Sequence, residues 1–449
     1  MYNIIAVKIS DKFGIGENAM TYNEAVEKIN SLLVFGSKPG LERIREFVER
    51  TGSPDKKLKF VHVAGTNGKG STCSFISSVL TSSGYKTGLF ISPYVLDFRE
   101  RFMIDGKMIP PKVLADIVSE LFPLVEQMKT EGKIITEFEF VLAVALVWYA
   151  RENCDIVVLE TGLGGRFDAT NIIETPLVSV ITSISLDHTK ILGDTYAKIA
   201  FEKCGIIKPD GITVAYKRQR KEAMEVIRKT AEERNNVLII ADSDNAEIIK
   251  SDIGGTVFNY NLDNQPLQIK IRLLGEHQVR NAVTALCTIS QLRKQGYYIP
   301  DSAVIKGFEN VSFPARMELL GNCPLIFLDG AHNPGGAKAL SETIDRYLKN
   351  KRKIGIAGML ADKDVESSMS ALLPKFDEII TVAPDNPRKM SPEDLAEIVK
   401  KYCPCVTSEN DLEKAYSIAL SRAGRDDAII IFGSLYLASD MRKIILSNK

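Results

Sequence analysis

The stretch that decides the fold is Gly65-Thr66-Asn67-Gly68-Lys69-Gly70-Ser71. An apolar run over residues 59–64 precedes it and predicts a buried strand, and residues 72–80 follow it with the pattern of a helix. A glycine-rich turn in this context lets backbone N–H groups approach an anion, while the helix N-terminus and the lysine add positive charge. The stretch therefore predicts a phosphate-binding loop rather than a ligand-free turn. It departs from the common Walker A spacing, because Gly70 separates Lys69 from Ser71.

The composition fits a globular enzyme of two domains. A chain of 449 residues is too long for one ordinary core, and 45% hydrophobic with 25% charged residues is average for globular proteins. Lys+Arg and Asp+Glu are each 57, so the formal net charge is zero. No overall field favours nucleic acid or an anionic membrane, and local groups must hold any anionic ligand.

Cysteine usage and hydropathy predict a cytoplasmic protein. The seven cysteines are an odd number, and only Cys403 and Cys405 lie close together, which disfavours both a disulfide framework and a metal site. The N-terminal apolar run, residues 4–7, is too short for a signal peptide. The strongest apolar helix, around residues 138–149, is too short to cross a bilayer.

Short apolar runs alternate with helical patterns along the chain. This alternation predicts an α/β fold with parallel sheets covered by helices. The expected strands of a first domain are 60–64, 86–91, 155–160, 178–184 and 212–215, with helices at 113–128, 139–151 and 220–234. Hairpins over about 242–268 and a helix at 278–294 follow. The pattern breaks at residues 310–316, and a second set begins with strands at 325–328, 353–357, 378–382 and 428–432. We therefore expect a domain of residues 20–312, a smaller Rossmann-like domain of residues 313–449, and an N-terminal extension of residues 1–19.

Three further segments of the first domain carry chemistry. The strand 155–160 ends in Glu160, an arrangement like Walker B, in which the acid holds Mg²⁺ directly or through water. It runs into a glycine-rich loop, residues 161–171, that contains an arginine and an aspartate. His188 follows the strand 178–184, and its place beside a nucleotide site favours a functional role over packing. Lys203, by itself, has the context of a solvated surface residue.

The motifs together resemble the folylpolyglutamate synthase/dihydrofolate synthase family, a branch of the Mur ligases, from about Met20 to Tyr436. The motifs that carry the resemblance are Phe35–Ile44, the phosphate loop, Ser92-Pro93-Tyr94, Glu100-Arg101-Phe102, Thr136–Glu139, Gly162–Asn171, Leu186-Asp187-His188, Glu202–Pro209, Gly275–Gln278 with Asn281, Pro314-Ala315-Arg316, Leu328–Pro334 and Phe432–Tyr436. The resemblance implies an ATP-dependent ligase with a P-loop ATPase-like first domain. Such an enzyme adds L-glutamate to a pteroate or folate carboxylate through an acyl phosphate.

The resemblance also implies a role for each matching residue. Thr66, Asn67, Gly68, Lys69, Gly70 and Ser71 would wrap the phosphates of ATP, with Asn281, Arg316, Asp329 and His332 as further nucleotide contacts. Ser92 and Glu160 would hold one Mg²⁺ and His188 a second, and a monovalent cation is a further candidate. Lys203 matches a lysine that becomes carbamylated. Lys69, His188, Lys203 and Arg316 are the expected catalytic residues.

The folate side of the site is expected in two segments. Thr136, Glu137, Phe138 and Glu139 match one wall of a pterin pocket, and Phe167, Asp168 and Ala169 match the other. Phe138 is a candidate stacking surface, with core packing as the alternative. Arg101 is a candidate substrate contact, and the loop 384–388 is a candidate glutamate contact.

Two positions depart from the family pattern, and the sequence leaves open which of two family reactions occurs. Tyr94 stands where many relatives carry histidine, and Ala315 where many carry glycine, which would stiffen the linker. A hinge near residue 312 would close the site. The motifs do not separate addition of the first glutamate to dihydropteroate from extension of an existing glutamate tail, and we favour extension. A muramyl-peptide ligase, a P-loop kinase or GTPase and a silent nucleotide-binding regulator are the disfavoured alternatives, and a monomer is expected.

Overall fold

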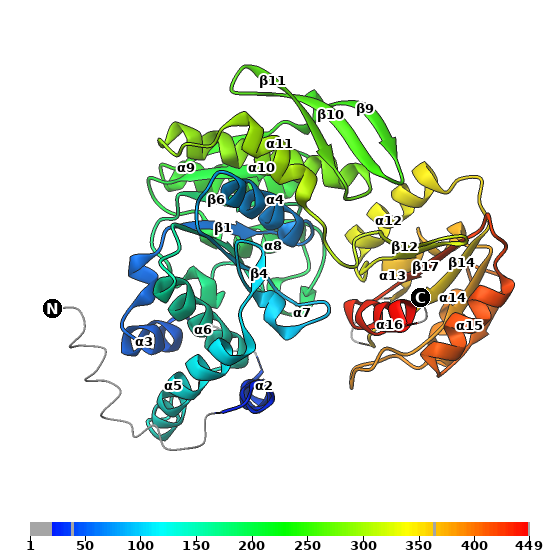
Figure 1. Cartoon of the computed structure of the whole chain (residues 1–449), viewed down its shortest axis with the longest axis horizontal. Coiled ribbons are helices and arrows are strands. Elements are labelled where there is room, and N and C mark those ends of the chain that lie inside the picture. Colours follow the sequence, from blue (N-terminus) through cyan, green and yellow to red (C-terminus); the bar gives the residue numbers. More distant parts are fainter. Residues whose placement is uncertain (1–19, 37–39, 362–364, 448–449) are drawn as a thin grey trace.

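The computed structural model describes residues 20–36, 40–361 and 365–447. Two α/β units stand side by side in Figure 1, each built around its own sheet. The predicted fold class, a parallel sheet with a second and smaller α/β unit, is confirmed. The predicted extension, residues 1–19, lies outside the described residues, as does Pro39 within the motif 35–44.

The first unit is built on an eight-stranded sheet in the order β4-β3-β2-β5-β1-β6-β7-β8. Six neighbouring strands are parallel, and β3 and β4 form an antiparallel edge. Because parallel strands point the same way, the carboxyl ends of β1, β2 and β5 meet at one edge, where α/β proteins bind ligands. The strands are β1 (Phe60–Ala64), β2 (Thr87–Phe90), β3 (Phe102–Ile104), β4 (Lys107–Met108), β5 (Ile156–Glu160), β6 (Val178–Ile181), β7 (Ile212–Tyr216) and β8 (Val237–Ala241).

Helices cover both faces of this sheet. On β5, Val157 and Leu159 pack in one core with α2 (Tyr22–Ser31), α3 (Glu42–Arg50), α5 (Pro111–Thr130) and α6 (Glu137–Arg151). The alternating residues Ile156 and Val158 pack in another core with α4 (Lys69–Ser82), α10 (Glu276–Lys294) and α11 (Asp301–Asn310). Successive side chains of a strand point to opposite faces, so a strand buried on both sides is mainly apolar. The short α7 (Thr189–Leu192) precedes α8 (Tyr196–Lys203), and α8 and α9 (Lys221–Glu233) form a third core with β6 and β7.

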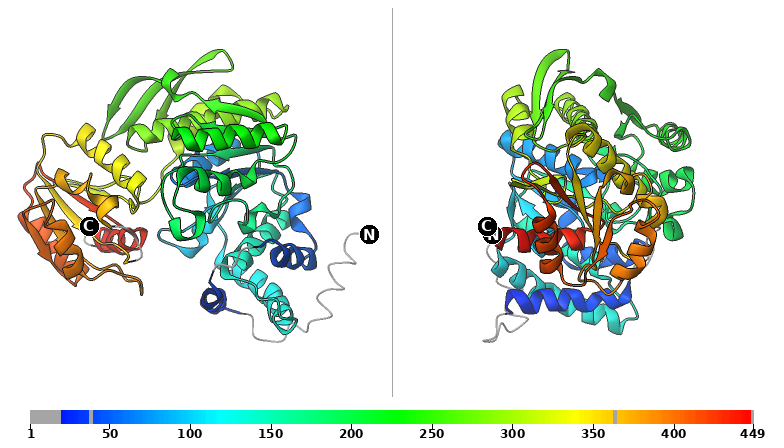
Figure 2. Two further views of the ribbon diagram at one scale, coloured as in Figure 1. Left: turned by 180° about the vertical axis from the view of Figure 1, so that it is seen from behind. Right: turned by 90° about the vertical axis from the view of Figure 1, so that its right-hand side faces the viewer.

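The predicted hairpins form a separate antiparallel sheet of β9 (Glu247–Asp252), β10 (Gly255–Leu262) and β11 (Gln265–Ile271). In Figures 1 and 2 this sheet lies at the end of the first unit opposite to α2 and α5. It reaches the second unit, because the Ser251 and Tyr347 hydroxyl oxygens are hydrogen-bonded at 2.7 Å.

The second unit has a six-stranded sheet in the order β12-β13-β17-β14-β15-β16, in which only the edge strand β12 is antiparallel. Its strands are β12 (Glu318–Asn322), β13 (Leu325–Leu328), β14 (Lys353–Ala357), β15 (Glu378–Thr381), β16 (Val406–Ser408) and β17 (Ala428–Phe432). One face packs against α12 (Pro334–Tyr347), α13 (Val365–Met369) and α14 (Pro392–Val399). The other face packs against α15 (Leu412–Arg422) and α16 (Leu435–Ser447).

Residues 311–317 connect α11 of the first unit to β12 of the second. Residue 312, the predicted domain boundary, lies in this connection. Ala315 and Met317 both have left-handed backbone conformations, with φ of 55° and 46°. Such conformations cost about 1–2 kcal/mol for residues other than glycine, so tertiary contacts must hold this turn in place.

Candidate functional site

The phosphate loop connects β1 to α4 at the carboxyl edge of the first sheet. Gly68 precedes the helix with a φ of 84°, and a Cβ there would lie 2.4 Å from Oδ1 of Asn281. A Cβ on Gly70 would lie 3.0 Å from the ring of Phe313. The glycines therefore leave room for Asn281, which the sequence analysis selected as a nucleotide contact, and for Phe313 of the connection, which it did not select.

Glu160 is a buried carboxylate at the end of β5. Its Oε1 lies 3.7 Å from Nζ of Lys69, and its Oε2 accepts a 3.2 Å hydrogen bond from the backbone N of Ser92. Burial raises the pKa of this carboxyl, opposed by Lys69, the Ser92 amide and Arg316. The structure thus brings together Lys69, Ser92 and Glu160, and the carboxylate has only one ion-pair partner among the described residues.

Lys203 lies at the end of α8 and is buried, with only 4% of its surface exposed. The solvated position that its own context suggested is therefore wrong, because α8 packs in a core with α9, β6 and β7. Its Nζ donates a 2.8 Å hydrogen bond to the carbonyl of Gly65. Burial, reinforced by the charge of Lys69, lowers the pKa of Lys203 to about 7. Near neutral pH, a large fraction of this amine is uncharged and nucleophilic.

His188 lies just before α7 with a left-handed φ of 50°. Its side chain is 47% exposed, and Nε2 lies 3.9 Å from a carboxylate oxygen of Asp187. The ring is accessible at the loop edge of the first unit, where a neutral imidazole can ligate a metal.

The second unit presents a charged cluster towards the same edge. Asp329 follows β13 and accepts 2.8 Å hydrogen bonds from the backbone N atoms of Met317 and Ala331. Burial raises the pKa of Asp329, and Arg316 opposes that shift. The Arg316 guanidinium lies 5.4 Å from the Phe313 ring centre and acts on Glu160 as well, so it stands between the two units. His332 Nδ1 is 2.8 Å from the carbonyl of Gly330.

The predicted pterin segments lie against each other, but three of their side chains also have structural partners. Thr136 and Glu139 form a capping box at the start of α6, and Arg43 pairs with Glu139 at 3.1 Å. Asp168 accepts from the backbone N of Leu163 at 2.7 Å and from Thr170. Capping of the helix and of the loop is therefore sufficient to explain why these three residue types occur here, without a ligand.

The aromatic and basic residues of this region are better placed to meet a ligand. Phe138 is half-buried and packs so closely on Gly162 that a Cβ there would lie 2.6 Å from the ring. Phe167 is 54% exposed, and Ala169 is buried beside it. Arg101 pairs with Glu137 at 2.6 Å and lies 5.2 Å from the ring centre of Tyr94.

This arrangement can bind and polarise a nucleoside triphosphate. The loop amides and Lys69 offer positive charge, and Arg316 approaches from the connection between the two units. Glu160 and Ser92 offer the oxygen ligands that Mg²⁺ prefers, and an underpaired buried carboxylate fits such a cation. No helix in residues 20–36, 40–361 and 365–447 is both long and apolar enough to span a membrane.

Comparison with known families places the chain in a class. The model of the Mur ligase middle domain matches residues 63–289, and that of the Mur ligase glutamate ligase domain matches residues 315–435. The two units and the loop between β1 and α4 are therefore those of a Mur ligase.

Individual relatives narrow the class. The chain is 37% identical to the dihydrofolate synthase/folylpolyglutamate synthase of Bacillus subtilis, over 94% of this chain and 98% of that protein. It superposes with a TM-score of 0.87 on Mycobacterium tuberculosis folylpolyglutamate synthase complexed with ADP, at 32% identity, covering 94% of this chain and 99% of that one. Escherichia coli FolC in complex with DHPP and ADP gives a TM-score of 0.83 at 27% identity, covering 96% and 99%. The chain belongs to the folylpolyglutamate synthase/dihydrofolate synthase family, which confirms the resemblance seen in its motifs.

Proposed function

We propose that this protein is an ATP-dependent ligase that joins L-glutamate to a folate or dihydropteroate carboxylate and releases ADP and phosphate. The observation that carries the proposal is the meeting of Lys69, Ser92 and Glu160 at the carboxyl edge of one sheet, where the charge of Arg316, in the connection, acts on both Glu160 and Asp329 of the other unit. A relative of 32% identity is described in complex with ADP, which supports a nucleotide at this edge.

The reaction has two steps. A substrate carboxylate oxygen attacks the γ-phosphorus of ATP, the bond to the bridging oxygen breaks, and ADP leaves. The amine of glutamate then attacks the acyl carbon, phosphate leaves, and the nitrogen loses a proton. The first step brings two anions together, so preorganised positive charge is the main requirement. We assign this charge to the loop amides, Lys69 and Arg316.

We assign Ser92 and Glu160 to one Mg²⁺ and His188 to a second. When bound, Mg²⁺ offsets charge on the phosphates and orients them. Asn281, Asp329 and His332 are assigned to the nucleotide, and the loop amides of residues 66–71 to its phosphates. The monovalent cation stays a prediction without a set of ligands.

We propose further that Lys203 is carbamylated. Only a neutral amine attacks CO₂, and a pKa of about 7 leaves that form abundant at pH 7.5. The carbamate would be an anion at the metal-binding edge instead of a second cation beside Lys69. Incubation with ¹³C-bicarbonate should give a carbamate signal in ¹³C NMR spectra, which Lys203→Arg should lack.

We assign the folate ring to the region of Phe138, Phe167 and Arg101. Glu137, Thr136, Glu139, Asp168 and Ala169 would shape that pocket through the helix start and loop that they stabilise. The glutamate contact at residues 384–388 and the closure around residue 312 stay predictions.

The test is ADP release with Mg²⁺, ATP and L-glutamate, comparing dihydropteroate with tetrahydrofolate monoglutamate. We expect turnover with tetrahydrofolate monoglutamate. Turnover with dihydropteroate as well would establish both activities, and turnover with dihydropteroate alone would make the protein a dihydrofolate synthase. Absence of glutamate-dependent turnover with either acceptor would overturn the proposal.

A further inference from the structure

Asn333 joins the two units at the phosphate loop. Its side chain is 3% exposed and lies immediately before α12. Its Nδ2 donates to Oδ1 of Asn67 at 3.1 Å and to Oδ2 of Asp187 at 2.9 Å. Its Oδ1 accepts from Nδ2 of Asn67 at 3.2 Å and from the backbone N of Gly336 at 2.8 Å. The amide therefore uses both of its donors and both of its acceptor positions.

The helix fixes which way this amide points. The backbone N–H of Gly336 lies in the first turn of α12, where it has no acceptor within the helix. It needs the oxygen of Asn333, so the NH₂ group must face Asn67 and Asp187. A carboxylate at this position could still cap the helix, but it would point an oxygen at two other oxygens.

The close approach of α12 depends on a second residue. A Cβ on Gly335 would lie 2.6 Å from Nδ2 of Asn67 and 2.8 Å from Oγ of Ser185. For a Cβ on Gly336, one residue later, the three nearest atoms belong to the second unit, the closest being Oδ1 of Asn333 at 3.3 Å. Gly335 thus faces the loop and Gly336 does not.

On the other side of the contact, Asn67 is anchored within the first unit. Its backbone N donates to the carbonyl of Ser183 at 3.3 Å, and its carbonyl accepts from Oγ of Ser183 at 3.1 Å. Its Nδ2 also donates to Oγ of Ser185 at 3.0 Å. Asn67 therefore moves with the phosphate loop, while its side chain contacts the second unit.

We propose that Asn333 is a positioning residue that couples phosphate binding in the loop to docking of the second unit. It acts through Asn67 and sets the approach of Arg316 and Asp329 to the nucleotide. This inference rests on the proposed function in one respect, that the loop holds the phosphates of ATP. Because linkage is reciprocal, docking strengthens nucleotide binding by the factor by which nucleotide strengthens docking.

The test uses two variants of the full chain that disturb the contact differently. Asn333→Asp keeps a good capping residue but removes both donors. Gly335→Ala favours the helix but inserts a methyl group between α12 and the loop. For both, we expect affinity for a non-hydrolysable ATP analogue to fall by about 10- to 100-fold, measured by calorimetry. We also expect a larger radius of gyration in small-angle scattering, which saturating analogue reduces towards the wild-type value.

Two control variants separate this contact from the rest of the interface. Lys338→Ala changes an exposed side chain of α12 that pairs with Glu342 of the same helix. Tyr347→Phe removes the hydrogen bond to Ser251 at the far end of the same helix. Both should bind the analogue within about twofold of wild type.

Each outcome is decisive. Wild-type affinity and radius of gyration in both Asn333→Asp and Gly335→Ala would overturn the coupling. So would an equal loss in Tyr347→Phe, because a contact between the units that does not involve the phosphate loop would then have the same effect as Asn333. A wild-type protein that binds no analogue would overturn the proposed function and the coupling together, whereas normal wild-type binding and turnover with unaffected variants would overturn the coupling alone.

Discussion

Two glutamates, Glu160 and Glu378, are buried to the same degree, with 3% and 4% of their surface exposed, at opposite ends of parallel strands. Glu160 ends β5 at the carboxyl edge of the first sheet, and Glu378 begins β15 at the amino edge of the second. Glu160 has a single lysine at 3.7 Å. Glu378 pairs with two arginines, Arg352 at 3.0 Å and Arg422.

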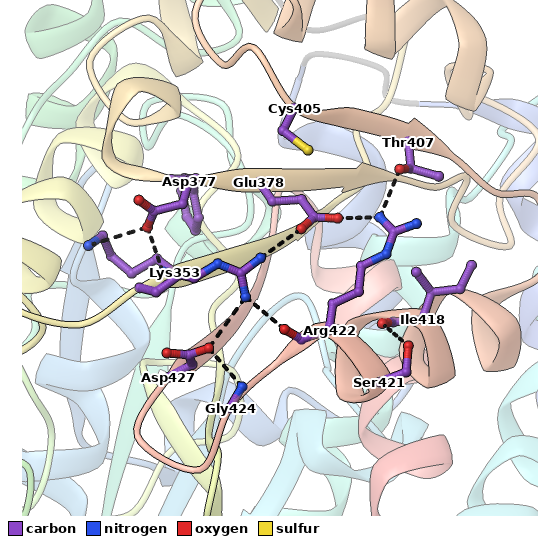
Figure 3. Close-up of polar contacts among 12 residues, drawn as sticks. Lys353, Asp377, Glu378, Cys405, Thr407, Ile418, Ser421, Arg422, Gly424 and Asp427 are labelled. Carbon is purple, nitrogen blue, oxygen red and sulfur yellow. Dashed lines mark hydrogen bonds and ion pairs between the residues drawn. The ribbon is translucent and has the colours of Figure 1, made fainter.

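The surroundings of Glu378 form a closed network, shown in Figure 3. Arg422 also donates to Oγ1 of Thr407 at 3.0 Å, and Arg352 donates to the carbonyl of Arg422 at 2.7 Å and to Asp427 at 3.3 Å. These contacts tie β14, β15, β16 and α15 together at the end of the sheet away from the phosphate loop.

The difference in pairing distinguishes a buried carboxylate that can bind a ligand from one that has a structural role. The charge of a fully paired buried carboxylate is compensated inside the protein, so removing that charge destabilises the fold by leaving its partners unpaired. A buried carboxylate with incomplete pairing carries a desolvation cost, which a bound cation can relieve. Position agrees with this distinction, because ligands of α/β sheets gather at the carboxyl ends of strands.

Of the substitutions considered, Glu160→Gln should have the largest effect. The effect should be on activity and not on stability. Loss of about 4 kcal/mol of stabilisation by the proposed Mg²⁺ corresponds to a kcat on the order of 10³-fold lower. The free energy of unfolding should stay equal or rise, because the neutral amide is easier to bury. The pKa of Glu160 is raised in the folded state, so its contribution to stability falls as pH increases from about 4.5 through the folded-state value. In Glu160→Gln, the free energy of unfolding measured by urea denaturation should not show this decrease with increasing pH.

The exposed Glu152, which pairs with Lys86, is the matched control. Glu152→Gln should keep both activity and stability near wild type. A Glu160→Gln variant that is active but unstable would reverse the roles assigned to the two buried glutamates.

Glu378→Gln should show the opposite pattern. Removing the charge leaves Arg352 and Arg422 without their shared partner, but both arginines are about 40% exposed and water screens them. We expect the free energy of unfolding to fall by roughly 1–3 kcal/mol, measured by urea denaturation. Activity per folded molecule should stay within about twofold of wild type. A large loss of kcat at unchanged stability would show that the network serves the reaction.

His62 is a buried ionisable residue of the first unit to which we assign no ligand, so it tests the effect of burial alone. It lies on β1, beside the strand of Glu160, and its Nε2 is 2.8 Å from Oγ1 of Thr170. Burial lowers the pKa of His62 from 6.5 to about 3. Between these values the unfolded chain binds the extra proton, so stability falls on acidification by up to about 1.4 kcal/mol per pH unit.

Denaturation curves between pH 6.5 and 4 should show this slope, and His62→Gln should flatten it by about one proton. An unchanged slope in the variant would mean that His62 does not titrate as its burial implies.

Thr407→Val should give the smallest effect. The substitution removes one hydrogen bond to Arg422 while leaving the pair with Glu378 intact. We expect about 0.5–1.5 kcal/mol of destabilisation and full activity. A loss as large as that of Glu378→Gln would indicate that the network acts as one cooperative unit, which a double-mutant cycle would measure.

Much of the fold could be predicted because its core strands are continuous apolar runs. The predicted strands 60–64, 325–328, 353–357 and 428–432 have the bounds found for β1, β13, β14 and β17. The edge strands β4, β12 and β16, and β3 next to β4, were not predicted, because short and partly exposed strands lack that signal. The apolar β8 was also overlooked, although it has a strand-like composition.

The candidate site also contains residues that the sequence indicated and residues that it did not. The loop Gly65–Ser71, the strand end at Glu160 and the family motifs are local patterns, and they were available from the sequence. Phe313 was missed as a neighbour of Gly70, although the break in pattern at residues 310–316 marked its segment. Asn333 before Pro334 carried the signature of a helix cap, but nothing in it indicated a partner in the other unit.

The sequence by itself determined the α/β class, the family and the phosphate loop, because each depends on residues close together in the chain. The tertiary structure alone decided that Lys203 is buried, that Glu378 pairs with two arginines and Glu160 with a single lysine, and that Asn67 meets Asn333 across 266 residues. Burial, pairing and docking depend on which distant surfaces come together, and the amino-acid pattern at either position does not contain that information.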